Sequence, residues 1–181
     1  MTYSKTLFDD VFIIEPEVYS DERGYFFESF KHNELCSIIG DINFVLEFES
    51  KSKKNTLRGL HYQTNPSAQA KLVNVSYGKA LDIIVDIKKG SKTFGQYITI
   101  ELSDENNKQV FIPKGYAHGF LAQSEITVMH YKLDGYYSAE HYTGINVFDK
   151  ELNIQLPIEI DKLCISDKDK ILPSLKDTIL F

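Results

Sequence analysis

The run Asn55–Gln63 sets Arg58 and His61 three positions apart among apolar and aromatic residues. Histidine has an unperturbed pKa of about 6.5, so its side chain can accept a proton near neutral pH. Arginine can hold a carboxylate or phosphate through two parallel N–H groups. In a regular strand Arg58 and His61 face opposite sides, while His61 and Gln63 share a side. The alternative interpretation is a half-buried strand with a hydrogen-bonded histidine.

A second run, Phe111–Phe120, has the spacing Pro-x-Gly-x-x-His and ends this pattern at His118. The proline and glycine predict a rigid turn that leads into a strand. This is the form of the second cupin motif, whose histidine is a ligand in metal-binding cupins. The first motif of those proteins supplies two more histidines and a glutamate, whereas this chain offers only His61, followed by tyrosine and glutamine. We therefore expect no metal and no other cofactor, and a metal-dependent cupin oxygenase is the contrasting possibility.

Alternation of apolar residues between turn residues predicts strands along most of the chain. Residues 72–88 read as two strands with a turn near Gly78, and further strands are predicted at 97–102, 109–112 and 127–133. The polar turn at 103–107 predicts a hairpin between the strands on either side of it. One short helix is predicted over Lys31–Ile39, with Gly40 as its C-terminal cap. This pattern indicates an all-β protein, an antiparallel sandwich or jelly roll, in a single domain over residues 1–181.

Composition narrows the possible partners and location. The 181 residues include 12 phenylalanines, 11 tyrosines and no tryptophan, at 43% hydrophobic content, which is typical of a globular protein. The net charge of −6 argues against general nucleic-acid binding. Cys36 and Cys164 have no metal-site or disulfide spacing, and no signal peptide or membrane-spanning run is evident. We expect a cytoplasmic protein that binds neither nucleic acid nor membrane.

Several segments in a fixed order give the chain a family resemblance from about Phe8 to Pro173. It resembles the nucleotide-sugar 3,5-epimerases of the cupin superfamily, of the dTDP-4-dehydrorhamnose 3,5-epimerase type. The matching segments are 21–28, 50–55, 57–63, 68–73, 93–96, 112–120, 131–132 and 136–138, together with Asp86. The resemblance implies a cupin-type double-stranded β-helix, or jelly roll, with short peripheral helices. It also implies a homodimer and a cofactor-independent epimerase of a nucleotide-diphosphate 4-keto sugar.

The chemistry of such a reaction sets what the site must contain. The C3 and C5 atoms both flank the C4 ketone, so one site can invert both carbons. A base must remove the proton next to the ketone, a cation must stabilise the enolate oxygen, and an acid must return a proton on the other face.

The resemblance places these catalytic roles on four residues. His61 matches the base, and Asp169 matches the carboxylate that orients it, although the nearby Asp167 is a competing candidate. Lys71 matches the enolate-stabilising lysine, and Tyr131 matches the acid. Without the family match, Lys71 reads as a surface strand residue and Tyr131 as a core aromatic.

Substrate binding is assigned in the same way. The resemblance implies that Arg23, Arg58 and His118 contact the diphosphate. It places Phe26, Glu28 and Tyr137 around the nucleotide base and pyrophosphate. The alternative for this last group is ordinary strand residues at a dimer edge.

One departure leaves the substrate open. Rhamnose-pathway enzymes carry Phe-Val-Gln-Asp-Asn-His before the Ser-Lys-Ser segment, whereas this chain has Phe44–Glu49, with Leu46 and Phe48 in place of the two amides. An apolar side chain cannot replace a hydrogen bond to the substrate. The alternatives are therefore a 3,5- or 3-epimerase of a GDP- or CDP-linked 4-keto hexose or heptose used for capsule or lipopolysaccharide. A 3,4-ketoisomerase and a non-catalytic sugar-nucleotide-binding cupin are further alternatives.

Overall fold

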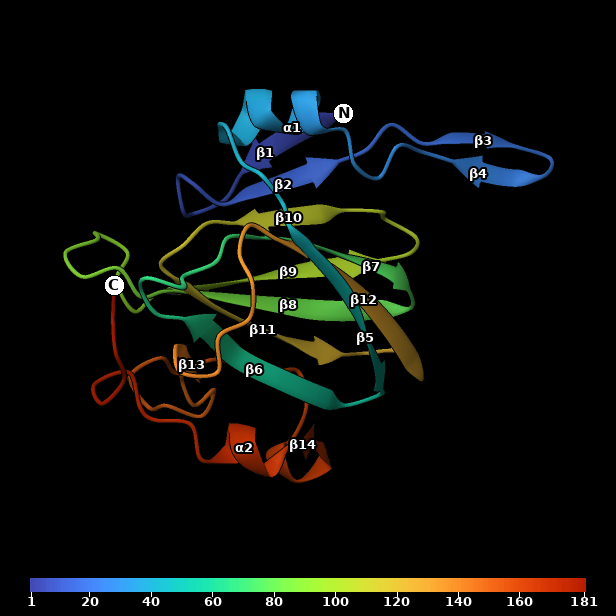
Figure 1. Cartoon of the computed structure of the whole chain (residues 1–181). Helices are drawn as coiled ribbons and strands as arrows, with labels where there is room; N and C mark the ends of the chain where they lie inside the picture. Colours follow the sequence, from blue (N-terminus) through green and yellow to red (C-terminus); the bar gives the residue numbers. More distant parts are fainter.

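Two antiparallel sheets face each other and form the predicted jelly roll (Figure 1). The computed structural model describes residues 1–181. The first sheet has the order β1 (Thr2–Lys5), β2 (Phe12–Glu15), β10 (Gln109–Ile112), β7 (Lys71–Tyr77), β12 (Ile126–Leu133), β5 (Leu46–Lys53). The second has the order β13 (Tyr142–Gly144), β6 (Thr56–Gln63), β11 (Tyr116–Ala122), β8 (Lys79–Asp86), β9 (Tyr97–Ser103). The short strand β14 (Cys164–Ile165) adds to β6 in parallel.

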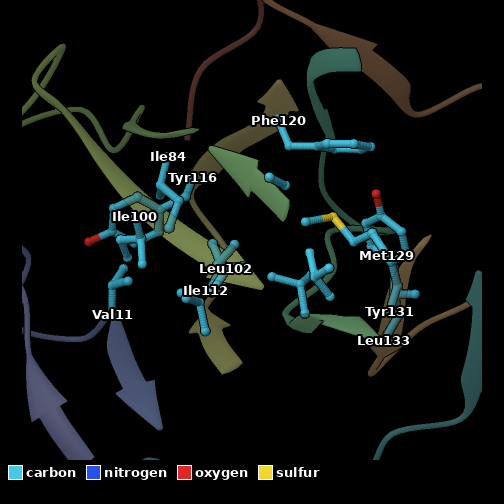
Figure 2. Packing of buried hydrophobic residues seen from close by; sticks show 14 of the residues in the cluster. Val11, Ile84, Ile100, Leu102, Ile112, Tyr116, Phe120, Met129, Tyr131 and Leu133 are labelled. Carbon is cyan, nitrogen blue, oxygen red and sulfur yellow. The ribbon is translucent and has the colours of Figure 1, made fainter. Parts of the chain in front are cut away.

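The interior of the jelly roll is a cluster of apolar side chains contributed by both sheets. Strand β12 shows how it arises, because Met129, Tyr131 and Leu133 alternate inward as predicted and are all buried. Figure 2 shows Met129 beside the Tyr131 ring, with Phe120 of the facing sheet at the same end of the cluster. That end of the cluster adjoins the cavity described below.

Short helices and the C-terminal segment cover the outer faces of the sheets. Helix α1 (His32–Ile39) packs Leu35 against the outside of the first sheet, and Gly40 ends it with a positive φ of 87°, as predicted. The segment from Ile145 onwards, which includes η1 (Ile160–Lys162) and α2 (Asp167–Lys170), covers the outside of the second sheet. Neither helix has the length and apolar character needed to cross a bilayer.

The predicted hairpin between residues 97–102 and 109–112 is wrong. Strand β9 pairs with β8, whereas β10 lies between β2 and β7 in the opposite sheet. The turn at 103–107 therefore carries the chain from one sheet to the other. All four residues of β10 are buried, and both of its edges are paired with first-sheet strands. A polar turn between two alternating runs is compatible with either route, so local pattern alone does not distinguish them.

A second prediction, that Arg58 and His61 face opposite sides of their strand, is wrong. Both side chains lie on the same side of β6 and line the same cavity. Opposite strand β11, His61 pairs with His118 and Arg58 pairs with Phe120, so the register shifts by one residue between them. Such a bulge holds one extra residue and shifts the alternation of side chains. Gly59 sits in the bulge with φ 114°, and a Cβ there would lie 2.6 Å from the Cα of Gly119. A glycine is therefore required at this position.

A two-stranded hairpin extends away from both sheets. Strands β3 (Tyr19–Asp21) and β4 (Gly24–Phe26) pair only with each other, and Figure 1 shows them projecting beyond the body of the molecule. Their residues are all exposed, including Phe26 at 65%. An exposed aromatic on a projecting hairpin is typical of a surface that meets another molecule.

Candidate active site

A cavity of about 850 Å³ opens between the two sheets. It is lined by seven of the ten residues predicted for the site. They are Arg58, His61, Lys71, His118, Tyr131, Tyr137 and Asp169. The two sheets place them on facing walls, since Lys71 and Tyr131 come from the first sheet and His61 from the second. A flat molecule held between these walls meets different groups on its two faces.

His61 and Asp169 form a hydrogen-bonded pair. His61 Nε2 lies 2.7 Å from Asp169 Oδ1, and the other carboxylate oxygen accepts the Gly59 N–H at 3.3 Å. Asp169 stands in the short helix α2, where the Ser166 side chain caps the start by accepting the Asp169 N–H. Two independent elements therefore hold the carboxylate against the imidazole. The competing candidate Asp167 has a side chain 98% exposed and pairs with Lys170 instead.

The environment of Asp169 keeps its carboxyl ionised. Burial raises its pKa, but the hydrogen bond and charge of His61, with the Gly59 N–H and Ser166, outweigh this and leave the pKa below its ordinary value. A carboxylate beside Nε2 favours the tautomer with the proton on that nitrogen. The Nδ1 atom is then left with the lone pair that a general base needs.

Lys71 is half-buried in the wall of the cavity rather than on the outer surface. Its Nζ donates to the backbone carbonyl of His61 at 3.1 Å, which places the ammonium next to the histidine. Burial lowers the pKa of Lys71 to about 8, against the opposing effect of the Asp82 charge. The lysine remains mostly protonated at neutral pH, in a setting where its charge is poorly screened.

Tyr131 presents its phenol to the cavity from the wall opposite His61, in the same sheet as Lys71. Its residue is 8% exposed, and its hydroxyl lies 3.4 Å from Ser50 Oγ. Burial raises the pKa of Tyr131 above its ordinary value, with a smaller opposing effect from the Ser50 hydrogen bond. The phenol therefore stays protonated over the physiological range, as a proton donor must.

His118 is among the buried residues that line the cavity. Its Nε2 is 2.7 Å from Oδ1 of Asp82, and both side chains are buried. Burial lowers the pKa of His118, in opposition to the charge and hydrogen bond of Asp82. A neutral imidazole offers no positive charge to a diphosphate, so this geometry does not favour the cationic role inferred for His118.

One end of the cavity is rich in cations. Arg58 is tied to strand β5 by hydrogen bonds from Nε to Ser52 Oγ at 3.0 Å and from a terminal nitrogen to the Lys51 carbonyl at 3.4 Å. Lys53 and Lys168 also line the cavity. This concentration of positive charge, in a chain of net charge −6, is suited to a diphosphate.

Tyrosines frame another part of the cavity. The rings of Tyr137 and Tyr142 are 5.5 Å apart, and Tyr142 is 5.2 Å from the His61 ring. Tyr137 is 63% exposed and lies at the mouth, where a planar base can stack on it. The segment that carries Tyr137 is anchored by Gln63, whose side chain bonds Tyr136 and Ser138.

Arg23, Phe26 and Glu28 lie outside the cavity of this chain. Arg23 bonds Asp21 in the projecting hairpin, and Glu28 pairs with Lys31. All three residues are exposed, and for Phe26 this leaves a large aromatic side chain in contact with solvent. Their predicted contacts with substrate require a cavity other than that of their own chain.

Several site residues were not predicted from the sequence. Asp82 had a usable signal, because it is a charged residue inside an otherwise apolar strand. Tyr142 and Lys168 had no such signal in the sequence. Tyr142 lies in the three-residue strand β13, and Lys168 lies in the four-residue helix α2. Phe48 was noted only as a departure from the family pattern, and it lines the cavity.

Comparisons with known proteins agree with this site. A family model for dTDP-4-dehydrorhamnose 3,5-epimerase matches residues 5–177. The dTDP-4-dehydrorhamnose 3,5-epimerase of Salmonella typhimurium is 43% identical over 182 residues, covering 99% of this chain and 98% of that protein. A crystal structure of the Legionella pneumophila dTDP-6-deoxy-D-glucose-3,5-epimerase with dTDP-4-keto-L-rhamnose has a TM-score of 0.93 at 41% identity, covering 97% of this chain and 93% of that one. A 3′-monoepimerase from Streptomyces bikiniensis with dTDP-quinovose has a TM-score of 0.87 at 29% identity, covering 93% and 85%.

The fold and the site define a cupin-type isomerase that acts as a carbohydrate epimerase. The chain belongs to the dTDP-4-dehydrorhamnose 3,5-epimerase family. Both the predicted fold class and the predicted kind of enzyme are confirmed.

Proposed function

We propose that this protein inverts C3 and C5 of dTDP-4-dehydro-6-deoxyglucose, with His61 as base and Tyr131 as acid. The observation that carries this proposal is the placement of the two groups on facing sheets of one cavity. A proton removed by His61 from one face of the sugar leaves a flat enolate. A proton returned by Tyr131 from the other face inverts the carbon.

The remaining groups complete the reaction. Asp169 holds the His61 imidazole in one tautomer and stabilises its positive charge once it has accepted the proton. Lys71 lies beside His61, where its ammonium stabilises negative charge on the C4 oxygen. Arg58 and the neighbouring lysines hold the diphosphate, and Tyr137 stacks on the base.

Proton exchange with solvent tests the reaction. With dTDP-4-dehydro-6-deoxyglucose in deuterated water, we expect deuterium at both C3 and C5, detected by NMR, with formation of the inverted sugar. Deuterium at C3 alone would identify a 3-epimerase, as in the Streptomyces bikiniensis relative. Movement of the carbonyl from C4 to C3 would identify a ketoisomerase. Binding without exchange at either carbon would leave a non-catalytic sugar-nucleotide-binding protein.

The nucleotide is inferred from the relatives rather than from contacts in this chain. The Legionella pneumophila structure holds a dTDP-linked sugar, which favours dTDP as the carrier. Leu46 and Phe48 line the cavity without amide groups, so GDP- and CDP-linked 4-keto hexoses or heptoses are the competing substrates. Comparison of kcat/KM for the three nucleotides decides between them, and we expect dTDP to be preferred.

We also propose that the protein works as a homodimer in which the β3–β4 hairpin of one protomer reaches the cavity of its partner. The projection of this hairpin, and the exposure of Arg23 and Phe26 on it, support the proposal. An isologous dimer would carry two such exchanges at once.

Mixing two inactive variants tests this arrangement. In the proposed dimer, the cavity of the Arg23→Ala protomer receives an intact hairpin from the His61→Ala protomer. We therefore expect the mixture to regain activity that neither variant has alone. No recovery after confirmed subunit exchange would contradict the shared site. Arg23 is paired only with exposed Asp21, so its removal is not expected to unfold the chain.

A further inference from the structure

Phe48 lies directly across from Tyr131 in the β5–β12 pairing. The two ring centroids are 4.6 Å apart and the ring planes differ by 17°, which is a stacked pair. Phe48 is 44% exposed and lines the cavity. It therefore packs on the phenol and still faces the space in which the sugar is expected to bind.

Other contacts to Tyr131 leave its hydroxyl loosely held. Its hydrogen bond to Ser50 is long, at 3.4 Å. The neighbouring His118 ring is 6.3 Å away in an edge-on arrangement. The stacked Phe48 is thus the closest aromatic contact of the phenol ring.

The wall beside this pair is apolar. Leu46 pairs with Leu133 two positions along from Phe48 and Tyr131, and both leucines line the cavity. Leu46 and Phe48 have no side-chain group that could hold an ordered water beside the acid. The Tyr131 ring is therefore flanked by hydrocarbon on this side, with the Ser50 hydroxyl beside its phenol oxygen.

We propose that Phe48 is a positioning residue that fixes the Tyr131 phenol at the place where it protonates the enolate. This inference rests on the proposed function, because it concerns how the proton returns to carbon. In that step the O–H bond of Tyr131 breaks and a C–H bond forms on the face opposite His61. Solvent then restores the phenol, and the proton on His61 is released to water.

The enolate has two possible fates, and their ratio reports the position of Tyr131. Return of hydrogen from His61 regenerates the starting sugar, and delivery from Tyr131 gives the inverted sugar. The His61 side chain is 23% exposed, so it can exchange its proton with deuterated solvent. The amount of deuterated but uninverted substrate, relative to inverted product, therefore measures how often Tyr131 does not protonate the enolate. This ratio does not depend on how much of the enzyme is folded.

Three substitutions at Phe48 separate the stack from the apolar cover. For Phe48→Ala, which removes the ring and the cover together, we expect the ratio of deuterated uninverted substrate to inverted product to rise roughly tenfold, the scale of a lost aromatic pair. Phe48→Leu keeps the cover but not the flat ring, so a smaller rise is expected. Phe48→Tyr keeps the stack and should retain the wild-type ratio. Tyr131→Phe, which removes the donor, gives the upper limit.

Phe94 provides a matched control, because it is similarly exposed at 38% and lies outside the cavity. Phe94→Ala should leave the ratio unchanged. An unchanged ratio in Phe48→Ala, or an equal rise in Phe94→Ala, would overturn the role of Phe48. A wild-type enzyme that exchanges no proton would instead remove the proposed function, so the two failures are distinguishable.

Discussion

His61→Ala is expected to abolish deuterium uptake at both C3 and C5 of the 4-keto substrate. One imidazole serves both carbons in the proposed reaction, so its loss removes both exchanges together rather than one of them. A positioned general base contributes about 10²- to 10⁴-fold in rate, and kcat should fall by that amount. The measurement is NMR of the sugar after incubation in deuterated water, combined with product assay.

The control for this variant is His130→Ala. His130 lies on β12 next to Tyr131 but points to the other side of the strand, where it pairs with Glu49 at 3.6 Å. It should retain wild-type exchange at both carbons. Full exchange by His61→Ala, or persistent exchange at just one carbon, would show that a different group removes the proton.

Lys71→Met should lower kcat/KM roughly 100-fold, as for the loss of one oxyanion donor. This corresponds to about 3 kcal/mol of lost transition-state stabilisation. Methionine fills a similar space without the buried charge, so the fold should not suffer. Lys79→Met is the control, since Lys79 begins β8 in the opposite sheet and is paired with Glu101 away from the cavity. A Lys71→Met enzyme with wild-type activity would show that the ammonium is not needed.

The pH dependence supplies a second test of Lys71. Burial lowers its pKa to about 8, so the ammonium form predominates below that pH and is lost as the pH rises through it. We expect kcat/KM to fall in the wild type as the pH rises through about 8, because kcat/KM reports the ionisation of the free enzyme. Arginine stays protonated there, so Lys71→Arg should remove this decline even if its maximum rate is lower. A decline that persists in Lys71→Arg would belong to another group.

The alternating pattern predicts much of this fold because strands such as β12 bury every second residue. Strands β7, β8 and β12 and helix α1 lie close to their predicted bounds. What local pattern does not contain is the choice of partner strand, so the sheet switch after β9 was missed. Pairing depends on contacts between residues far apart in the chain, and a polar turn is compatible with both outcomes.

The candidate site divides in a similar way. His61 and Lys71 stand in strands whose inward face is set by alternation and by one bulge, and the structure brings them together. Asp169 reaches His61 from the other end of the chain, which spacing alone cannot show. Arg23 and Phe26 lie on a hairpin that projects from both sheets, so the role proposed for them depends on the proposed dimer.

The bulge in β6 also supplies a contact to the site that no side chain makes. The Gly59 N–H of this bulge reaches Asp169 Oδ2, so the backbone itself supplies one of the contacts that orient the His61–Asp169 pair. Replacing side chains leaves this donor in place. Deleting Gly59 would remove it, while Arg58 and His61, now two positions apart, would still face the same way. At this position the extra residue of the strand, and not a side chain, supplies the contact to Asp169.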